Sequence, residues 1–327
     1  MMTSTTLFYI AENLNKRITP AQMNAFQSVC DESKVTLQQN LNNIEIMNQL
    51  KAKPESFLIL DVDDFICFIK KNNTLVNENF ILMPQEKESF ELESHKDELK
   101  KIRFIIGNPP NDLLKIFLTH IFAYKNSSDK KGICSYFDKE NNVYFKHEVM
   151  HSSERSTLQQ KVTDFFQEEI QKNKDKLVAG TSSYAKSMGD ILDEFLMNAI
   201  WDANPKRADT DRSIPIALNE DEKVDLLCIF DTLNFILSVS DQFGTFYGGV
   251  IEKYICHALG LKEPRVGISQ NTAGAGLGIF MVMQKIGVLI FEVEKGKITR
   301  ATAIARGDQT MRDLQKKPKT ILFFERN

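Results

Sequence analysis

Hydrophobic and polar positions along the first 124 residues alternate in short runs, as expected for a parallel sheet with helices between its strands. Apolar runs predict five strands, at residues 7–11, 35–38, 57–61, 80–83 and 102–107. Amphipathic stretches predict helices at residues 20–30, 43–51 and 112–124, the first with Thr19 as its N-cap. Five strands interleaved with helices predict a flavodoxin-like α/β domain over residues 1–124.

The pattern changes after the polar segment KNSSDKKG, residues 125–132, which is the predicted linker. Residues 133–149 predict two strands around an Asn141–Asn142 turn, and residues 156–173 and 188–203 predict helices. Strands are expected at residues 214–218, 224–230 and 235–240, a helix at 247–258, and a hairpin of residues 288–293 and 298–305 about Lys295–Gly296. Residues 133–327 therefore predict an α+β sandwich of helices on an antiparallel sheet.

The charge, the cysteines and the apolar runs of the chain indicate which partners and which cellular compartment to expect. The net charge is −3 with acidic and basic residues well mixed, which argues against a nucleic-acid surface or a polybasic membrane anchor. Five scattered cysteines, with no C-x-x-C pair, are expected to be reduced thiols. The amino-terminal residues lack the pattern of a secretory signal, and no apolar run reaches the ~18 residues of a membrane span, so we expect a cytoplasmic protein.

A glycine-rich turn, G-A-G-L-G, lies at residues 274–278 directly before the apolar helical run IFMVMQKI. Gly274, Gly276 and Gly278 would let the backbone approach a ligand closely, and the free amides of a helix N-terminus favour a phosphate. Taken alone, the pattern is better explained as a plain tight turn.

A second pattern is the four-residue repeat of Glu194, Asn198 and Asp202. This spacing puts the three side chains on one face of a helix, beside apolar contacts. Such a polar stripe is usually a solvated face. The functional alternative is that Asn198 gives an oxygen to Mg²⁺ and Glu194, one turn earlier, polarises a nucleophile.

A third pattern is S-V-S-D-Q-F-G at residues 238–244, where an apolar strand ends in Asp241 and then Gly244. A carboxylate at a strand end can accept hydrogen bonds from an exocyclic amine such as that of adenine. Asp-x-x-Gly is equally typical of a simple turn, and this pattern alone favours neither interpretation.

The order of these three patterns resembles the ATPase superfamily of DNA gyrase, heat-shock chaperones, histidine kinases and mismatch-repair ATPases, over about residues 150–310. The resemblance implies a pocket for ATP and Mg²⁺, in which Asn198 binds the metal and Asp241 the adenine amine. It further implies that the glycines of residues 274–278 form a lid on the phosphates, with Asp202 and Gly244 among the nucleotide-binding candidates. One departure is that Phe243 and Thr245 stand where that family has glycines.

The succession of a strand, a helix at 156–173 and then the Glu194–Asn198 helix is similar to that of bacterial anti-sigma-factor serine kinases. That resemblance implies a partner-switching protein that binds ATP and phosphorylates a serine or threonine on a regulatory partner, with Glu194 as the base. The partner would resemble an anti-sigma antagonist or a sigma factor.

Two alternatives stay open: an interaction module with a degenerate pocket, and an atypical histidine kinase. His151 lacks the two-helix hairpin that a phosphoacceptor needs and is expected in a loop or at a strand end. Whether the protein is a homodimer is also open.

The amino-terminal domain resembles a response-regulator receiver in its pattern of elements, with Asp61 at the end of the third predicted strand. The first strand is followed by Ala11–Glu12–Asn13 in place of an acidic pair, and the fifth by Gly107–Asn108–Pro109 without a lysine. We therefore predict a pseudo-receiver that contacts proteins, with an unrelated α/β module as the alternative. The cluster of Asp61, Asp63 and Asp64 is predicted to be a solvated turn in preference to a metal site.

Overall fold

The computed structural model describes residues 7–33, 35–41, 43–52, 56–72, 79–84, 99, 102–107, 109–126, 131–137, 139–207, 210–246 and 277–326. The chain divides into two compact units. The first runs to Ile133 and includes Lys317–Leu322; the second runs from Cys134 to Lys316 in its described part and includes the chain from Phe323 onward.

The first unit has a parallel sheet in the order β2-β1-β3-β4-β5. Its strands are β1 (Leu7–Ala11), β2 (Thr36–Leu41), β3 (Phe57–Leu60), β4 (Phe80–Leu82) and β5 (Phe104–Ile105). The beginning of β11 (Thr320–Arg326) pairs with β5 in the antiparallel sense. The helices are α1 (Glu12–Arg17), α2 (Pro20–Ser33), α3 (Asn43–Ala52), α4 (Val62–Asn72) and α6 (Asn111–Asn126).

The sequences of these strands and helices explain why they form. Every residue of β3, Phe-Leu-Ile-Leu, is buried, which is typical of a central parallel strand covered on both faces. Helix α2 begins with a reciprocal cap, in which the Gln22 N–H donates to Thr19 Oγ1 over 3.2 Å and the Thr19 N–H donates to Gln22 Oε1 over 2.9 Å. The prediction of an α/β arrangement with Thr19 as a cap is confirmed.

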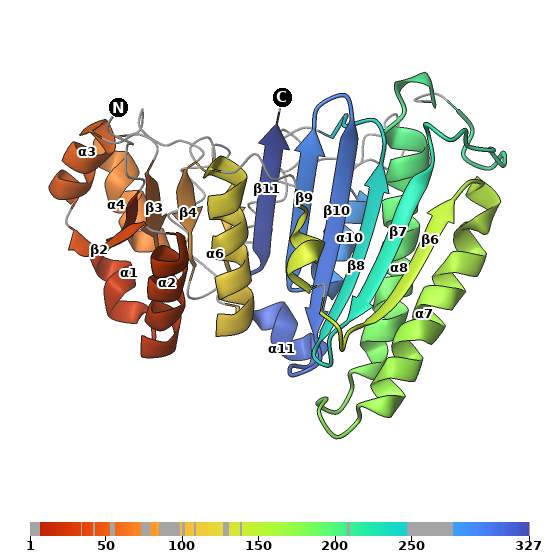
Figure 1. The fold of residues 1–327 in the computed structure, drawn as a ribbon, viewed down its shortest axis with the longest axis horizontal. Coiled ribbons are helices and arrows are strands. Elements are labelled where there is room, and N and C mark those ends of the chain that lie inside the picture. The colour runs from red at the N-terminus through yellow and green to blue at the C-terminus, as the bar shows by residue number, and fades with distance from the viewer. Residues whose placement is uncertain are drawn as a thin grey trace. The chain divides into compact units, whose positions relative to one another are not determined.

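The second unit has an antiparallel sheet in the order β9-β10-β8-β7-β6 (Figure 1). Its strands are β6 (Val143–Val149), β7 (Val224–Phe230), β8 (Asn234–Asp241), β9 (Val288–Glu294) and β10 (Ile298–Arg306). Its helices are α7 (Arg155–Lys172), α8 (Ser182–Met197), α10 (Leu277–Lys285) and α11 (Met311–Lys316). Helix α8 continues directly into a π turn, Asn198–Asp202.

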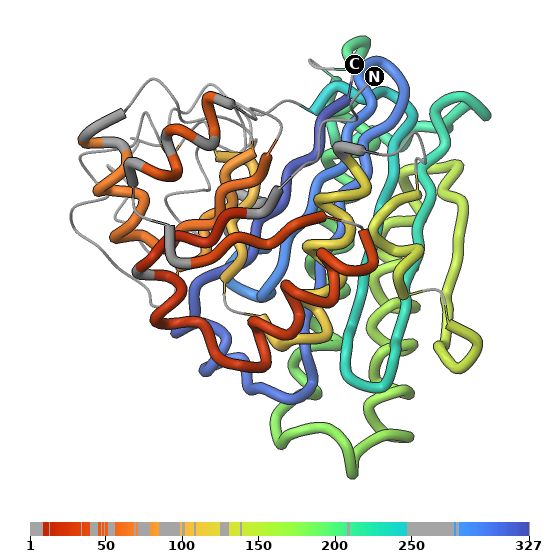
Figure 2. Tube along the Cα trace, turned by 60° about the vertical axis from the view of Figure 1, so that its left-hand side comes forward, coloured from red at the N-terminus to blue at the C-terminus, as the bar shows by residue number. Residues whose placement is uncertain are grey.

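Aromatic side chains join the helices of this unit to its sheet. Phe235 of β8 contacts Phe166 of α7 at 5.6 Å and Tyr184 of α8 at 5.7 Å between ring centroids. Helices α7 and α8 pack along each other and can be followed in yellow-green and green in Figure 2. Helices α7 and α8 thus rest on β8, all of whose residues are buried.

Several expected elements differ from the structure. Residues 133–137 form a 3₁₀ helix, Ile133–Phe137, where a strand was predicted, because a short apolar run fits either structure. Residues 214–218 make one isolated bridge, His151 with Ala217, and no strand. The backbone of Ile216 is instead hydrogen-bonded to Ser152. The Ser152 N–H donates to the Ile216 carbonyl over 2.9 Å, and Ser152 Oγ accepts the Ile216 N–H over 2.7 Å.

Other differences concern boundaries and omissions. Helix α8 begins at Ser182, earlier than the predicted residue 188, and α1, α4, α11 and β11 were not predicted. The helix expected at residues 247–258 lies outside the described residues.

Candidate functional site

Glu194 and Asn198 lie one turn apart where helix α8 ends. Both side chains are half-buried, and neither makes a hydrogen bond or ion pair with any residue that the structure describes. Burial raises the pKa of Glu194, and the neighbouring Asp193 raises it further, against the opposing charges of Arg155 and Lys285. Two polar groups without partners in a partly buried setting are a candidate ligand site.

The helix changes its winding at this point. The Ala203 N–H donates to the Asn198 carbonyl over 2.8 Å, an i→i+5 bond that closes the π turn. Such a turn holds one residue more than an α turn, so the four-residue repeat predicted for the polar stripe ends at Asn198. Asp202 forms an ion pair with Arg212. Its pKa is raised by burial, with Arg212 opposing the shift.

Gly278 brings the glycine-rich segment into contact with this helix. A Cβ at residue 278 would overlap Oε2 of Glu194, so the first turn of α10 lies directly against the Glu194 carboxylate. Gly278 is buried, whereas Gly274 and Gly276 lie outside the described residues. Two of the three predicted motif segments are therefore neighbours at Glu194.

Asp241 ends β8 and is buried, with 5% of its surface exposed. Its Oδ1 accepts hydrogen bonds from the N–H groups of Phe243 at 2.9 Å and Gly244 at 3.3 Å. Burial raises its pKa to about 6 in spite of these hydrogen bonds. One oxygen of this carboxylate thus stabilises its own turn, as the simple interpretation of Asp-x-x-Gly predicts.

Gly244 is required by the same turn. Its φ is +60°, and a Cβ there would overlap the carbonyl of Glu294 in the β9–β10 hairpin. Its own carbonyl accepts the Gly296 N–H over 3.2 Å. The glycine therefore has a packing role that needs no ligand.

The residues that follow Asp241 contact the end of the π turn. Thr245 Oγ1 donates to the Ala203 carbonyl over 2.8 Å, and the ring of Phe246 stacks on Phe291 with centroids 4.3 Å apart. This places the third motif segment at the end of the helix that carries Asn198.

A pocket of about 190 Å³ opens beside Glu194, between α7, α8 and α10. Its carboxylates Asp190 and Asp193 are neutralised by Lys285 at 2.6 Å and Arg155 at 2.7 Å, which leaves Glu194 as the one acid of the lining without an ion pair to a described residue. The lining comprises Gln159, Asp190, Ile191, Asp193, Glu194, Met281, Val282 and Lys285. Pockets for drug-sized ligands are usually about 300–1,000 Å³, so this one suits a small group and not a whole nucleotide.

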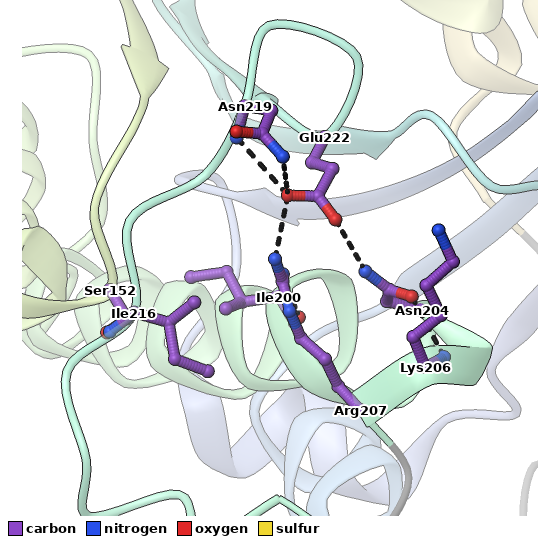
Figure 3. Close-up of polar contacts among 8 residues, drawn as sticks. All are labelled: Ser152, Ile200, Asn204, Lys206, Arg207, Ile216, Asn219 and Glu222. Atoms are coloured by element: carbon purple, nitrogen blue, oxygen red, sulfur yellow. Dashed lines mark hydrogen bonds and ion pairs between the residues drawn. The ribbon is translucent and has the colours of Figure 1, made fainter.

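Three charged residues of the site were not found from the sequence. Arg155 donates twice to Asp193 and lies 5.3 Å from the ring centre of Trp201. Arg207 and Glu222 form a partly buried ion pair beyond the π turn (Figure 3). Each pair joins residues 15 or more positions apart, so no local periodicity marks it.

The acidic cluster of the first unit is not the solvated turn that was predicted. Asp61 is 1% exposed and Asp64 is 4% exposed. Asp61 Oδ1 caps α4 by accepting the Asp64 N–H over 2.8 Å, and Asp64 Oδ2 accepts the Leu14 N–H over 2.8 Å. Arg17 lies 3.0 Å from Asp61 Oδ2 and 2.6 Å from Asp63 Oδ2, so the cluster contains its own cation. Burial raises the pKa of Asp61 to about 6, and Arg17 opposes the shift.

Metal sites, membrane-spanning helices and the position of His151 also bear on the function. Within the described part of the chain, no group of three histidine, cysteine or acidic side chains is arranged to hold a metal ion. No helix found there is both long and apolar enough to cross a bilayer. His151 makes the isolated bridge and caps a short 3₁₀ helix, which confirms its expected place at a strand end.

No family model and no curated protein sequence matches this chain.

Proposed function

We propose that the second unit binds ATP with Mg²⁺ and serves as a regulatory switch that phosphorylates a serine or threonine of a partner protein. The carrying observation is a pair of side chains, Glu194 and Asn198, that have no partner among the described residues and lie near the end of a helix that contacts both other motif segments. π turns are rare and often occur at functional sites, which supports this assignment.

The chemistry would be divided between these two residues. The amide oxygen of Asn198 is a hard ligand of the kind that Mg²⁺ prefers. Glu194, whose pKa is raised, is a better base near neutral pH than an ordinary carboxylate and faces a pocket wide enough for a hydroxyl-bearing side chain. Gly278 at the start of α10 would bring backbone amides close to a phosphate.

The competing proposal is an interaction module that has lost its nucleotide. It is favoured by the turn at Asp241, where one oxygen is already engaged and Gly244 has a packing role. Its second support is Phe243, which adds a bulky ring beside the expected adenine position.

For the first unit we propose a pseudo-receiver that contacts proteins. The strand order 2-1-3-4-5 is the flavodoxin-like order, in which ligands bind outside the carboxyl ends of the strands. At that edge Arg17 pairs with Asp61 and Asp63, which supports a role without bound metal or phosphate.

The single tryptophan gives a direct test of the ATP proposal, because Trp201 lies within the π turn. Titration of ADP and ATP, with Mg²⁺ and with EDTA, is followed by Trp201 fluorescence and calorimetry. We expect saturable binding that Mg²⁺ strengthens, and loss of the Mg²⁺-dependent part in Asn198→Ala. Gln160→Ala, which removes an exposed amide on α7, is the matched control and should bind like wild type. No binding by wild type at millimolar nucleotide would favour the interaction module.

A further inference from the structure

The π turn depends on hydrogen-bond donors from outside its helix. The last carbonyls of any helix lack partners within it and must find them elsewhere. Here the Ile200 carbonyl accepts Nη1 of Arg207 at 3.2 Å, and the Ala203 carbonyl accepts Thr245 Oγ1. Arg207 also places a positive charge at the negative end of the helix dipole.

Arg207 makes a second bond with the other arm of its guanidinium. Nη2 lies 2.7 Å from Glu222 Oε2, and the two side chains are 13% and 14% exposed. A planar guanidinium can reach the carbonyl and the carboxylate together, whereas a lysine ammonium is a single point charge. The geometry therefore uses a property that is specific to arginine.

Glu222 connects this arginine to the rest of the unit, as Figure 3 shows. Its Oε2 accepts the N–H and Nδ2 of Asn219 at 3.2 Å each, and its Oε1 accepts Nδ2 of Asn204 at 2.9 Å. Burial favours the neutral form of Glu222, but these hydrogen bonds and Arg207 outweigh it and lower the pKa. The carboxylate is thus a charged anchor just before β7.

We infer that Arg207 and Glu222 are positioning residues, which hold the π turn and thereby fix the direction of the Asn198 side chain. This inference rests on the proposed function for the role of Asn198 as a Mg²⁺ ligand. Residues that orient a metal ligand typically change metal affinity about 10- to 100-fold when they are replaced. We expect a loss of that size in the Mg²⁺-dependent part of nucleotide binding.

The test uses Arg207→Lys in the full chain, because lysine keeps the charge opposite Glu222 and gives up the two-armed contact. A second variant, Arg207→Met with Glu222→Gln, removes both charges together and avoids a lone buried charge. Arg306→Lys is the matched control: Arg306 is 6% exposed, binds Asp308 through two nitrogens, and lies at the opposite end of β8 and β10 from Asp241.

Two quantities are measured in each protein. The first is the exchange rate of the Ala203 amide hydrogen by NMR, which reports the π turn with no nucleotide present. The second is the ratio of ADP affinity in Mg²⁺ to that in EDTA. For Arg207→Lys and the double variant, but not for Arg306→Lys, we expect Ala203 exchange to accelerate by about tenfold or more. We also expect the affinity ratio to fall about 10- to 100-fold, with the affinity in EDTA nearly unchanged.

The outcomes separate the inference from the proposed function. If Ala203 exchange stays at the wild-type rate, Arg207 does not hold the turn and the inference is wrong, whether or not nucleotide binds. If exchange accelerates and the affinity ratio is unchanged, the positioning of Asn198 is overturned. If wild type binds no nucleotide, the proposed function fails, and the exchange rate of Ala203 alone decides whether the network holds the turn.

Discussion

Asp241→Asn should stabilise the second unit at neutral pH, although it replaces a residue with two good hydrogen bonds. The pKa of Asp241 in the folded protein is about 6, against an ordinary value of 3.8. The folded state therefore binds a proton more tightly than the unfolded state, and stability falls as pH rises from about 4 to about 6. A shift of two units at 1.36 kcal/mol each gives a cost of roughly 3 kcal/mol above pH 6.

Asparagine is nearly the same shape, its Oδ1 can accept both N–H groups of the turn, and it carries no charge to desolvate. We expect the free energy of unfolding of Asp241→Asn, relative to wild type, to be higher at pH 7.5 than at pH 4 by up to about 3 kcal/mol. Urea unfolding followed by Trp201 fluorescence reports this unit, since Trp201 is the single tryptophan and is buried there.

Asp164→Asn on α7 makes the same change at an exposed carboxylate and should alter the free energy by no more than about 0.5 kcal/mol at either pH. A variant of Asp241 that is less stable than wild type at pH 7.5 would show that hydrogen bonding to the charged form outweighs burial, and the reasoning would be refuted. The same variant should bind adenine nucleotides more weakly if the Asp241 carboxylate receives the adenine amine.

Three further predictions concern the two units. Glu194→Gln should reduce phosphate transfer to a partner recovered from native cytosol by about 10²–10⁴-fold and leave ATP affinity nearly intact; a large loss of ATP affinity would instead indicate a structural role. Gly278→Ala should displace the Glu194 carboxylate, which a Cβ would overlap, and slow transfer about 100-fold while the free energy of unfolding changes by no more than about 1 kcal/mol. Unchanged transfer would show that Glu194 need not lie there. Acetyl phosphate should give no phosphate adduct on Asp61 by intact mass, because Arg17 already pairs with it; a stoichiometric adduct lost in Asp61→Asn would identify a working receiver.

Local patterns predicted the elements whose hydrogen bonds and packing are local or apolar. The strand at residues 57–61 was found because all of Phe57–Leu60 is buried, and α2 was found because Thr19 and Gln22 cap it reciprocally. The strand expected at residues 214–218 failed for the opposite reason. There the partner of Ile216 is the backbone and hydroxyl of Ser152, 64 residues away, and no periodicity records that contact.

The candidate site divides in the same way. Helical spacing identified Glu194 and Asn198, because both lie on or at the end of a regular helix. It could not foresee the π turn, which changes the spacing after Asn198 and leaves Asp202 paired with Arg212. A π turn makes no more backbone hydrogen bonds than an α turn. The groups that stabilise the π turn must therefore lie outside the helix.

Those groups are the donors at the end of the helix. Arg207 and Thr245 satisfy the carbonyls of Ile200 and Ala203 from two separate segments, and the partly buried Glu222 keeps Arg207 in place. A partly buried ion pair contributes little net stability, since the cost of desolvating the charges offsets much of their attraction. Its presence beside two polar side chains that have no partner in the described part of the chain is better explained by the geometry that it imposes on the helix end. On that argument the irregular turn and its charged anchor form one feature, and Asn198 is the residue whose position they set.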